Sequence, residues 1–276
     1  MTNRRSFVWA PPAEPSAFAA LHARVLGDGS DTVLLVHGLG GSNRYWGAIF
    51  DDLGRVGRLV VPDLLGFGAS SLSPAGYGVD DHAAAVSELL DELDVRRRIR
   101  IATHSFGTLV GLRLAALRGD QVSSITAFAP ALYSNAAAAR SHLRHSGSMA
   151  RLGLVDGRLA QHACQFVCRH RPLAARMASW VRRDLPRAVA EDSVVHTWDS
   201  YSETLQAMID ADVGRLLDAI ECPVLLVAGR RDRLLDRSCL ATLDASPAVR
   251  LQWWDGDHHL PLRNPIRCCT AIVDAP

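Results

Sequence analysis

The sequence of 276 residues predicts an α/β fold, in which a mostly parallel central sheet is flanked by helices. Two observations support this prediction. Short apolar runs rich in β-branched residues alternate with longer helical patterns through the first half of the chain, and the alternation resumes near the C-terminus. Between these two parts lies a long stretch without strand-like runs. We therefore expect an α/β core of residues 1–133 and 213–276, interrupted by a helical insertion over residues 134–212.

Six apolar runs have the length and composition of buried strands. They are Thr32–His37, Arg58–Asp63, Ile99–His104, Val122–Ala129, Val224–Gly229 and Val249–Trp254. Helices are expected over Val79–Leu93 and Phe106–Leu117. In the first of these, apolar residues from Val86 onward repeat at helical spacing behind the candidate N-caps Asp80 and Asp81.

The helical insertion has an uneven charge distribution. Residues 134–190 contain ten arginines against two acids, whereas residues 191–212 contain six acids and no base. Helix faces of opposite charge could simply be solvated and pair with each other. Alternatively, the basic part could recognise an anionic substrate or an acyl group attached to a carrier.

Composition excludes several classes of function. The net charge of +1 gives no reason to expect nucleic acid as a partner, so a small-molecule substrate is favoured. All 30 basic residues are arginine, which excludes Schiff-base chemistry and a lysine general base. The six cysteines show no disulfide framework of the secreted type and are expected to be thiols.

The N-terminal segment from Met1 to Leu21 carries prolines where a signal peptide needs an unbroken apolar stretch. Apolar runs elsewhere, such as Val224–Ala228, are far shorter than the roughly 20 residues of a membrane helix. We therefore expect a cytoplasmic protein with no membrane partner. The sequence does not indicate an oligomeric state.

The segment from Ile99 to Gly107 carries the strongest chemical signal. A buried strand runs directly into Ser105 and then into a helix, which is the arrangement of a nucleophile elbow. This turn requires small residues two positions before and after the nucleophile, because the helix crosses close to the strand. Gly107 meets the requirement, but Thr103 stands where glycine is usual. An ordinary turn with Ser105 as a helix cap is the alternative interpretation.

A serine hydroxyl needs a hydrogen-bonded base, and the base needs an acid to orient it. Asp232 follows the next-to-last expected strand, where a carboxylate would project from the carboxyl edge of the sheet beside Ser105. Asp236 is the nearest substitute for this acid. His258 and His259 follow the last strand and are the two candidates for the base.

Acyl transfer also needs N–H donors for the oxyanion. The glycine-rich turn from His37 to Ser42 follows the first expected strand and is suited to this role. The backbone N–H groups of Leu39 and Phe106 would be the two donors. Phosphate binding by the same turn is the alternative, but the turn lacks the lysine and the spacing of a P-loop.

Taken together, these segments resemble the α/β-hydrolase superfamily, in particular its lid-bearing esterases and carbon–carbon bond hydrolases. The resemblance spans about residues 25–272. Two positions depart from the family pattern, Thr103 and Asp257, where the family has glycine. Five motifs carry the resemblance in the family's order: His37–Gly40, Pro62–Ser70, His104–Gly107, Gly229–Asp232 and Asp257–His258.

The resemblance implies the α/β-hydrolase fold and a catalytic triad of Ser105, His258 and Asp232. Pro265 lies seven residues after His258, as it does in the family, and this spacing selects His258 over His259 as the base. A serine at position 105 argues against the dehalogenase and epoxide hydrolase branches, which use aspartate there.

The resemblance also implies that the helical insertion acts as a cap over the substrate pocket. Trp198 and Tyr201 of this cap, together with Gly38 and His104 of the core, are the expected substrate-binding residues. The expected reaction is hydrolysis of a carboxylic ester or thioester through an acyl-serine intermediate.

Other functions remain open on the same scaffold. The triad could serve elimination, cyclisation, acyl transfer or carbon–carbon bond cleavage in a biosynthetic pathway, and a non-catalytic small-molecule receptor is a third alternative. No cofactor is expected. A cluster of His162, Cys164, Cys168 and His170 suggests metal binding, but one helix seldom brings four such close ligands around a tetrahedral ion. We therefore expect no metal.

Overall fold

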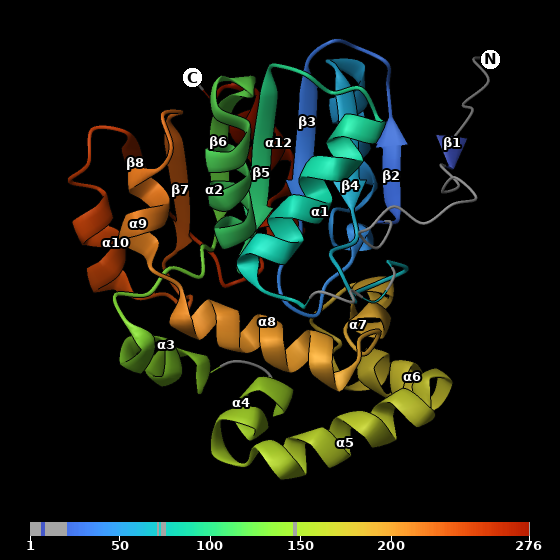
Figure 1. Ribbon diagram of the computed structural model, residues 1–276. Coiled ribbons are helices and arrows are strands. Elements are labelled where there is room, and N and C mark those ends of the chain that lie inside the picture. Colours follow the sequence, from blue (N-terminus) through green and yellow to red (C-terminus); the bar gives the residue numbers. More distant parts are fainter. Residues whose placement is uncertain (1–6, 9–20, 71, 73–75, 146–147, 276) are drawn as a thin grey trace.

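The computed structural model describes residues 7–8, 21–70, 72, 76–145 and 148–275. Most of the segment Met1–Leu21, for which the sequence predicts no signal peptide, lies outside these residues. The described chain forms one sheet with helices on both faces, which confirms the predicted α/β class (Figure 1).

The sheet has the strand order β1-β2-β4-β3-β5-β6-β7-β8. Neighbouring strands from β4 through β8 are parallel, whereas β2 is antiparallel to β4 and the two-residue β1 is antiparallel to β2. All six predicted strands are present to within one residue. The strands are β1 Phe7–Val8, β2 Ala23–Leu26, β3 Thr32–Val36, β4 Arg58–Pro62, β5 Ile99–His104, β6 Val122–Phe128, β7 Val224–Gly229 and β8 Val249–Trp254.

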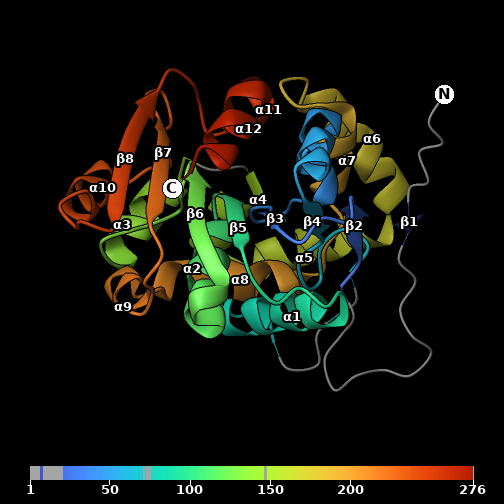
Figure 2. The ribbon, with the colours of Figure 1, turned by 90° about the horizontal axis from the view of Figure 1, so that it is seen from above.

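Two apolar layers enclose the sheet. Helices α1 (Val79–Glu92) and α2 (Gly107–Arg118) cover one face, and α11 (Leu260–Arg263) and α12 (Pro265–Val273) cover the other (Figure 2). The 3₁₀ helix Ala48–Arg55 packs beside α12 on this second face. The central strand β3 is buried along its whole length, which explains why it reads as a continuous apolar run.

The helical insertion lies across the carboxyl ends of the strands (Figure 1). Its described residues form helices and connecting turns and no strand. The helices between β6 and β7 are α3 Ala136–Leu143, α4 Ser148–Val155, α5 Gly157–Arg169, α6 Arg171–Val181, α7 Arg187–Asp192, α8 Trp198–Asp210 and α9 Val213–Asp218, and α10 Arg237–Leu243 follows β7. Within the described ranges, no helix combines the length and the apolar character required to span a bilayer.

The register of the sheet brings the loops that follow β3, β5 and β6 to one edge. Val36 at the end of β3 is paired with Thr103 of β5, and His104 is paired with Phe128 at the end of β6. Because these parallel strands end at the same level, the residues that follow them are neighbours in space.

The threonine at position 103 is accommodated by a glycine in the facing helix. Thr103 is completely buried, and its Oγ1 lies 3.1 Å from Oγ1 of Thr108 at the start of α2. A Cβ atom placed on Gly111, one helical turn further on, would come within 2.7 Å of Thr103 Cγ2. Position 103 of the strand lacks the usual glycine, and Gly111 of the helix provides the space instead. Helix α2 can therefore still cross close to β5.

This contact predicts a stability effect with a specific rescue. Gly111→Ala should lower the free energy of unfolding by about 1–3 kcal/mol, because the added methyl collides with Thr103 Cγ2. Thr103→Ser removes that methyl and keeps the hydroxyl, so it should restore most of the loss in the double variant. Urea unfolding measures both. Gly157→Ala, at a glycine with open space around it, is the control and should be neutral or slightly stabilising. If Thr103→Ser does not restore the stability that Gly111→Ala removes, another contact is responsible for the loss.

Candidate active site

Ser105 lies in a sharp turn between β5 and α2. Its φ angle is +53°, in the left-handed region that a residue with a side chain rarely adopts. Backbone hydrogen bonds hold this conformation: Ser105 N–H donates to Phe128 O at 3.1 Å, and Ser105 O accepts from the N–H of Thr108 at 3.0 Å. Strain of this kind persists only where surrounding structure fixes it, and it is frequent at functional sites.

The glycine-rich loop after β3 packs directly against this turn. A Cβ atom on Gly107 would lie 2.6 Å from the carbonyl oxygen of His37, and one on Gly38 would lie 3.0 Å from Cβ of Ser105. Glycine is therefore required at both positions by close backbone approach. As a result, the loop that carries Leu39 is fixed beside Ser105.

The two expected oxyanion donors are available for a ligand. Within the described residues, the backbone N–H groups of Leu39 and Phe106 make no hydrogen bond. Phe106 directly precedes α2, so its N–H belongs to the positive end of the helix dipole. Leu39 is half-buried beside Gly38. This arrangement suits the stabilisation of a developing negative charge near Ser105.

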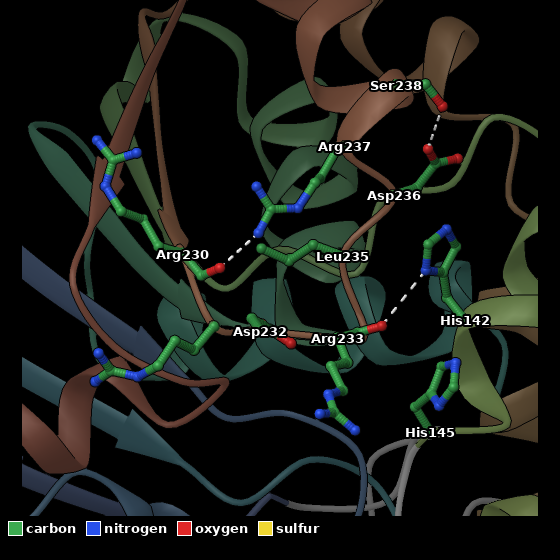
Figure 3. A pocket seen from close by; sticks show the side chains of 10 residues that line it. His142, His145, Arg230, Asp232, Arg233, Leu235, Asp236, Arg237 and Ser238 are labelled. Carbon is green, nitrogen blue, oxygen red and sulfur yellow. Dashed lines mark hydrogen bonds between the residues drawn. The ribbon is translucent and has the colours of Figure 1, made fainter.

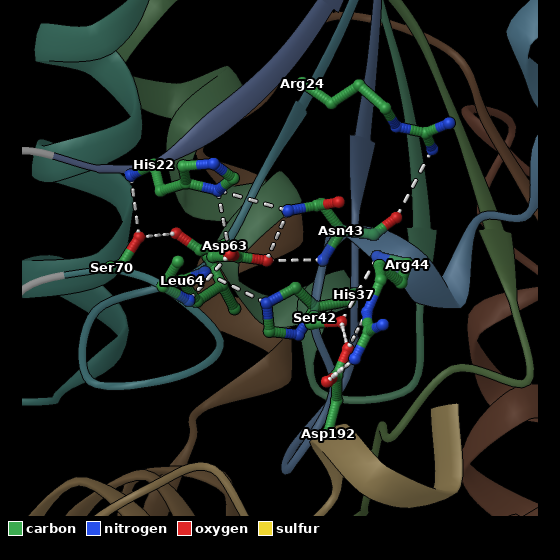
Figure 4. A network of polar contacts seen from close by, with 11 residues as sticks. His22, Arg24, His37, Ser42, Asn43, Arg44, Asp63, Leu64, Ser70 and Asp192 are labelled. Atoms are coloured by element: carbon green, nitrogen blue, oxygen red, sulfur yellow. Dashed lines mark hydrogen bonds and ion pairs between the residues drawn. The ribbon is translucent and has the colours of Figure 1, made fainter. Parts of the chain in front are cut away.

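A buried carboxylate at the end of β4 holds the base of the glycine-rich loop (Figure 4). Oδ1 of Asp63 accepts hydrogen bonds from the backbone and side-chain amides of Asn43 at 2.5 and 3.0 Å. Its Oδ2 lies 3.1 Å from Nδ1 of His22 and accepts from the N–H of Ala69 at 2.9 Å. Asp63 thus ties three separate segments together behind the site.

The same loop is joined to the helical insertion. Asp192 at the end of α7 is 8% exposed and accepts from Ser42 Oγ at 2.5 Å and from Arg44 Nε at 2.7 Å. A second guanidinium nitrogen of Arg44 contacts the other carboxylate oxygen, so the pair is bidentate (Figure 4). Paired geometry of this kind is specific as well as stabilising. It anchors α7 to the loop that carries Leu39.

The structure brings Asp232 and His258 together. Oδ2 of Asp232 lies 2.8 Å from Nδ1 of His258, and Oδ1 accepts from the N–H of Leu234 at 2.8 Å. The carboxylate side chain is completely buried, whereas the imidazole is 17% exposed. With Nδ1 donating its proton to the carboxylate, Nε2 of His258 is the free basic nitrogen.

His104, directly before Ser105, supports the loop that carries His258. Its Nε2 lies 2.9 Å from the carbonyl oxygen of His258, so this nitrogen carries the proton and donates it. Its ring stacks on Tyr45 with a centroid separation of 4.3 Å. Burial, reinforced by His258 and His259, holds the pKa of His104 well below its usual value, and the ring is neutral. The sequence did not indicate this role, and contact of His104 with substrate stays a prediction.

His259 has different partners from His258. Its Nδ1 lies 3.4 Å from the hydroxyl of Tyr45, and its Nε2 lies 3.5 Å from a guanidinium nitrogen of Arg182 in the helical insertion. Among the contacts of the described residues, Asp232 has none with His259. The contact with Asp232 therefore favours His258 over His259 as the base.

Asp236, the substitute acid, has a different position and partners. Its carboxylate accepts from the backbone N–H of Ser134 at 3.0 Å and from the hydroxyl of Ser238 at 2.6 Å, and it caps α10 through Cys239 N–H. Burial alone would raise the pKa of Asp236, but hydrogen bonds from the hydroxyls of Ser134 and Ser238 lower it below the usual value. Asp236 thus fixes the point where the chain enters the helical insertion.

The two aromatic residues expected from the insertion differ in position. Tyr201 of α8 is 9% exposed, and its Cε2 would lie 3.8 Å from a Cβ atom on Gly40, which places it beside the glycine-rich loop. Trp198 at the start of α8 is half-buried, and in the described part of the chain it has no ring contact with the other site residues. Gly38 lies against Ser105, as described above.

A basic cavity of about 700 Å³ lies along the loop that carries Asp232 (Figure 3). Asp232 lines this cavity, but Ser105 and His258 do not. The cavity therefore lies next to the candidate site, on the side of Asp232. Its lining combines cationic and imidazole side chains: Arg230, Arg231, Arg233, Arg237, His142 and His145. Positive charge of this density favours anionic groups.

The cysteine and histidine cluster of α5 shows no metal-binding geometry. Sγ of Cys164 lies 3.8 Å from Nδ1 of His196, and Cys168 donates to the carbonyl oxygen of His196 at 3.1 Å. His162 and His170 are exposed on the helix. In the part of the chain that the structure describes, no group of three or more suitable side chains could hold a metal ion.

Comparison with known proteins gives consistent matches. Residues 33–271 match the model of the "Alpha/beta hydrolase family". A protein of Klebsiella pneumoniae described as "Putative carbamate hydrolase RutD" is 30% identical over 234 residues, which cover 82% of this chain and 84% of that protein. The protein of the same description from Pseudomonas syringae pv. syringae is 31% identical over 246 residues, covering 85% and 89% of the two chains.

Solved structures share the fold at lower identity. A hydrolase from Pseudomonas aeruginosa superposes with a TM-score of 0.71 at 22% identity, covering 99% of this chain and 98% of that one. An enol-lactonase from Burkholderia xenovorans superposes with a TM-score of 0.69 at 22% identity, covering 93% and 96%.

Two buried histidines, His82 and His104, and the half-buried His259 predict a loss of stability on mild acidification. Burial lowers the pKa of His82 to about 3 and that of His259 to about 4, and it also lowers the pKa of His104. Histidines of the unfolded chain titrate near 6.5, so between pH 6.5 and about 4 the unfolded state binds more protons than the folded state. Stability present at pH 7 is therefore lost as the pH falls through this window, by up to about 2 kcal/mol for each such histidine at pH 5.

Thermal unfolding at pH 7.5 and pH 5 measures this loss. The Tm should fall at the lower pH, and His259→Gln should make the fall smaller because one titrating group is removed. Exposed His162 provides the control, since His162→Gln should leave the fall unchanged. The lowered pKa of Asp236 acts only below about pH 4 and does not contribute. An equal Tm at the two pH values would contradict the neutral state of these histidines.

Proposed function

The chain belongs to the alpha/beta hydrolase family, and we propose that it is a serine hydrolase that cleaves a carboxylic ester or thioester through an acyl-serine intermediate on Ser105. The observation that carries this proposal is the 2.8 Å contact between Asp232 and His258 at the sheet edge where Ser105 occupies a strained turn. An acid, a base and a nucleophile gathered at one edge are what acyl transfer requires.

In the proposed first step, the Oγ of Ser105 attacks the carbonyl carbon of the substrate while its proton moves to Nε2 of His258. Asp232 stabilises the imidazolium that forms. The carbonyl oxygen becomes an oxyanion, which accepts hydrogen bonds from the N–H groups of Leu39 and Phe106. The tetrahedral intermediate then breaks the bond to the leaving alcohol or thiol, which takes the proton from His258.

In the second step, water attacks the acyl carbon of the ester formed on Ser105 and gives a proton to His258. Collapse releases the carboxylic acid and returns that proton to Oγ. In this structure Ser105 Oγ makes no hydrogen bond among the described residues, and catalytic contacts often tighten only when substrate is bound. We expect the contact between Oγ and Nε2 of His258 to form in that complex.

We propose residues 134–212 as a cap over this site, with residues 1–133 and 213–276 as the catalytic core. The support is the position of the helices across the strand ends and the anchoring of Asp192 to Arg44 of the core. Tyr201 beside Gly40 is the cap residue best placed to contact a substrate. Trp198 and Gly38 stay candidates for the same role.

The substrate class has two lines of support. The basic cavity beside Asp232 supports the anionic or carrier-bound acyl group expected from the sequence. The similarity to proteins described as carbamate hydrolases favours a carbamate as a second candidate, since the same nucleophile would then form a carbamoyl-Ser105. Both candidates use the same acyl-transfer steps, so the residues with proposed roles do not change.

A fluorophosphonate probe tests the proposed nucleophile. The probe should label the wild-type chain, and peptide mapping should place the label on Ser105. Ser105→Ala should abolish both labelling and the hydrolysis of short p-nitrophenyl esters, because no other hydroxyl occupies the turn. Ser134→Ala removes a hydroxyl that donates to Asp236 and should remain labelled. A label elsewhere, or undiminished hydrolysis by Ser105→Ala, would refute the proposal.

Paired variants test the acid and the base. Asp232→Asn should reduce kcat/KM by about 10³–10⁴-fold, because the imidazole loses its orienting carboxylate. Asp236→Asn should mainly lower stability, because its partners tie two loops together. His258→Gln should abolish ester hydrolysis, whereas His259→Gln should retain it. Steady-state kinetics and Tm values separate the two effects, and the reverse ranking within either pair would reassign the triad.

A further inference from the structure

The outer end of the helical insertion exposes an unusual number of large apolar side chains. Among the described residues, 13 large hydrophobic residues are exposed, and seven of them lie in the short stretch between positions 155 and 181. Exposed apolar side chains that cluster on a folded surface commonly mark an interaction site, whereas apolar residues scattered singly do not. The seven are Val155, Leu159, Phe166, Leu173, Met177, Trp180 and Val181.

On α6 these residues form one stripe. Leu173, Met177 and Trp180 are spaced by four and three residues, which places them on a single face of the helix. Their exposed fractions are 58%, 58% and 69%. An amphipathic helix of a folded protein normally buries such a face, but here the face is turned to solvent.

On α5 the apolar residues point away from the rest of the protein. Ala160 and Cys164 are completely buried on the inner side of this helix, where Cys164 approaches His196. Leu159 and Phe166, seven residues apart, share another face and are 55% and 63% exposed. Both helices lie at the end of the molecule that is remote from the sheet (Figure 1).

Arginines without acidic partners accompany this surface. In the ranges that the structure describes, Arg158, Arg169, Arg176 and Arg183 form no salt bridge, and all four are exposed. The guanidinium of Arg183 lies 5.2 Å from the centre of the Trp180 ring. The positive charge is therefore not neutralised within the chain and is available to a partner.

We propose that this surface, called here the docking face and made of the exposed apolar residues of α5 and α6 with their flanking arginines, binds peripherally to anionic lipid bilayers. Exposed aromatic and aliphatic side chains would enter the boundary between headgroups and acyl chains, while the arginines contact lipid phosphates. The sequence predicts no membrane partner because it has no spanning segment, but interfacial binding does not require one.

The charge distribution selects this occupant over a second copy of the chain. A symmetric dimer through the docking face would place two arginine-rich surfaces against each other, and like charges brought together disfavour association. An anionic surface complements both the apolar and the cationic side chains. The proposal is independent of the catalytic assignment, since Ser105 and His258 belong to the core.

Co-sedimentation of the full-length protein with vesicles tests the proposal. Vesicles of phosphatidylglycerol and phosphatidylcholine in equal parts should bind the wild type, and vesicles of phosphatidylcholine alone should bind it much more weakly. High salt should reduce the binding, because it screens the arginines. Met177→Gln/Trp180→Gln and Arg176→Gln/Arg183→Gln should each weaken binding by about tenfold or more.

Matched controls come from exposed residues outside the insertion. Val56, 57% exposed before β4, and Arg97, exposed before β5, lie at the amino ends of the strands, on the edge of the sheet opposite the insertion. Val56→Gln and Arg97→Gln should bind vesicles within about twofold of the wild type. All variants should keep the Tm of the wild type and its hydrolysis of a water-soluble ester, which separates loss of docking from loss of folding or catalysis.

Several results would overturn the proposal. It fails if the wild type does not sediment with anionic vesicles, or if it binds neutral vesicles equally well without a salt effect. It also fails if the docking-face variants bind like the controls. A dimer that Met177→Gln/Trp180→Gln converts to a monomer in sedimentation equilibrium, without vesicle binding, would assign the face to self-association instead.

Discussion

The architecture of the site depends on how closely two backbone segments approach each other behind Ser105. The turn into α2 passes so near the end of β3 that a side chain at position 107 would collide with the carbonyl oxygen of His37. This contact helps to fix Ser105 at a positive φ, and it also fixes the position of the next residue, Phe106, whose N–H makes no hydrogen bond within the described residues. The proposed nucleophile and one proposed oxyanion donor are therefore positioned by one packing constraint, before any ligand is bound.

Three buried aspartates then connect the loops around this turn, each with a different task. Asp63 holds the glycine-rich loop, Asp192 joins that loop to α7, and Asp236 fixes the entry into the helical insertion. Asp232, in contrast, is directed at His258. Each of these three carboxylates accepts several hydrogen bonds, which makes it specific in its partners. The insertion is consequently coupled to the loop that carries Leu39.

The parts of the molecule with a periodic signal could be predicted from the sequence. The six buried strands appear in the sequence as apolar runs. The serine turn, the acid and the histidine were each found because they follow such a run. Strand β2 was not predicted, because a short, half-buried strand such as Ala23–Leu26 leaves no such run. The pattern of residues left both His258 and His259 open as the base, the family resemblance selected His258, and the contact of Asp232 with His258 supports that choice.

Contacts between residues remote in the chain could not be predicted. The hydrogen bond of His104 to the carbonyl of His258 joins residues 154 positions apart, and that of Ser42 to Asp192 spans 150. Neither the residue types nor their local spacing indicates that these residues are in contact. The sequence also could not show that the apolar stripe of α6 faces solvent, because periodicity identifies a face of a helix but not what covers it.

The pairing of Thr103 with Gly111 has a consequence for how relatives of this chain are found. The room usually made by a glycine in the strand is made here by Gly111 of α2, eight residues beyond Thr103 in the sequence. A search with the usual glycine-serine-glycine signature would pass over such a chain, whereas the pattern T-x-S-x-G-x-x-x-G describes it. In other chains of this fold that carry the pattern, we expect the same exchange of bulk between strand and helix at this turn.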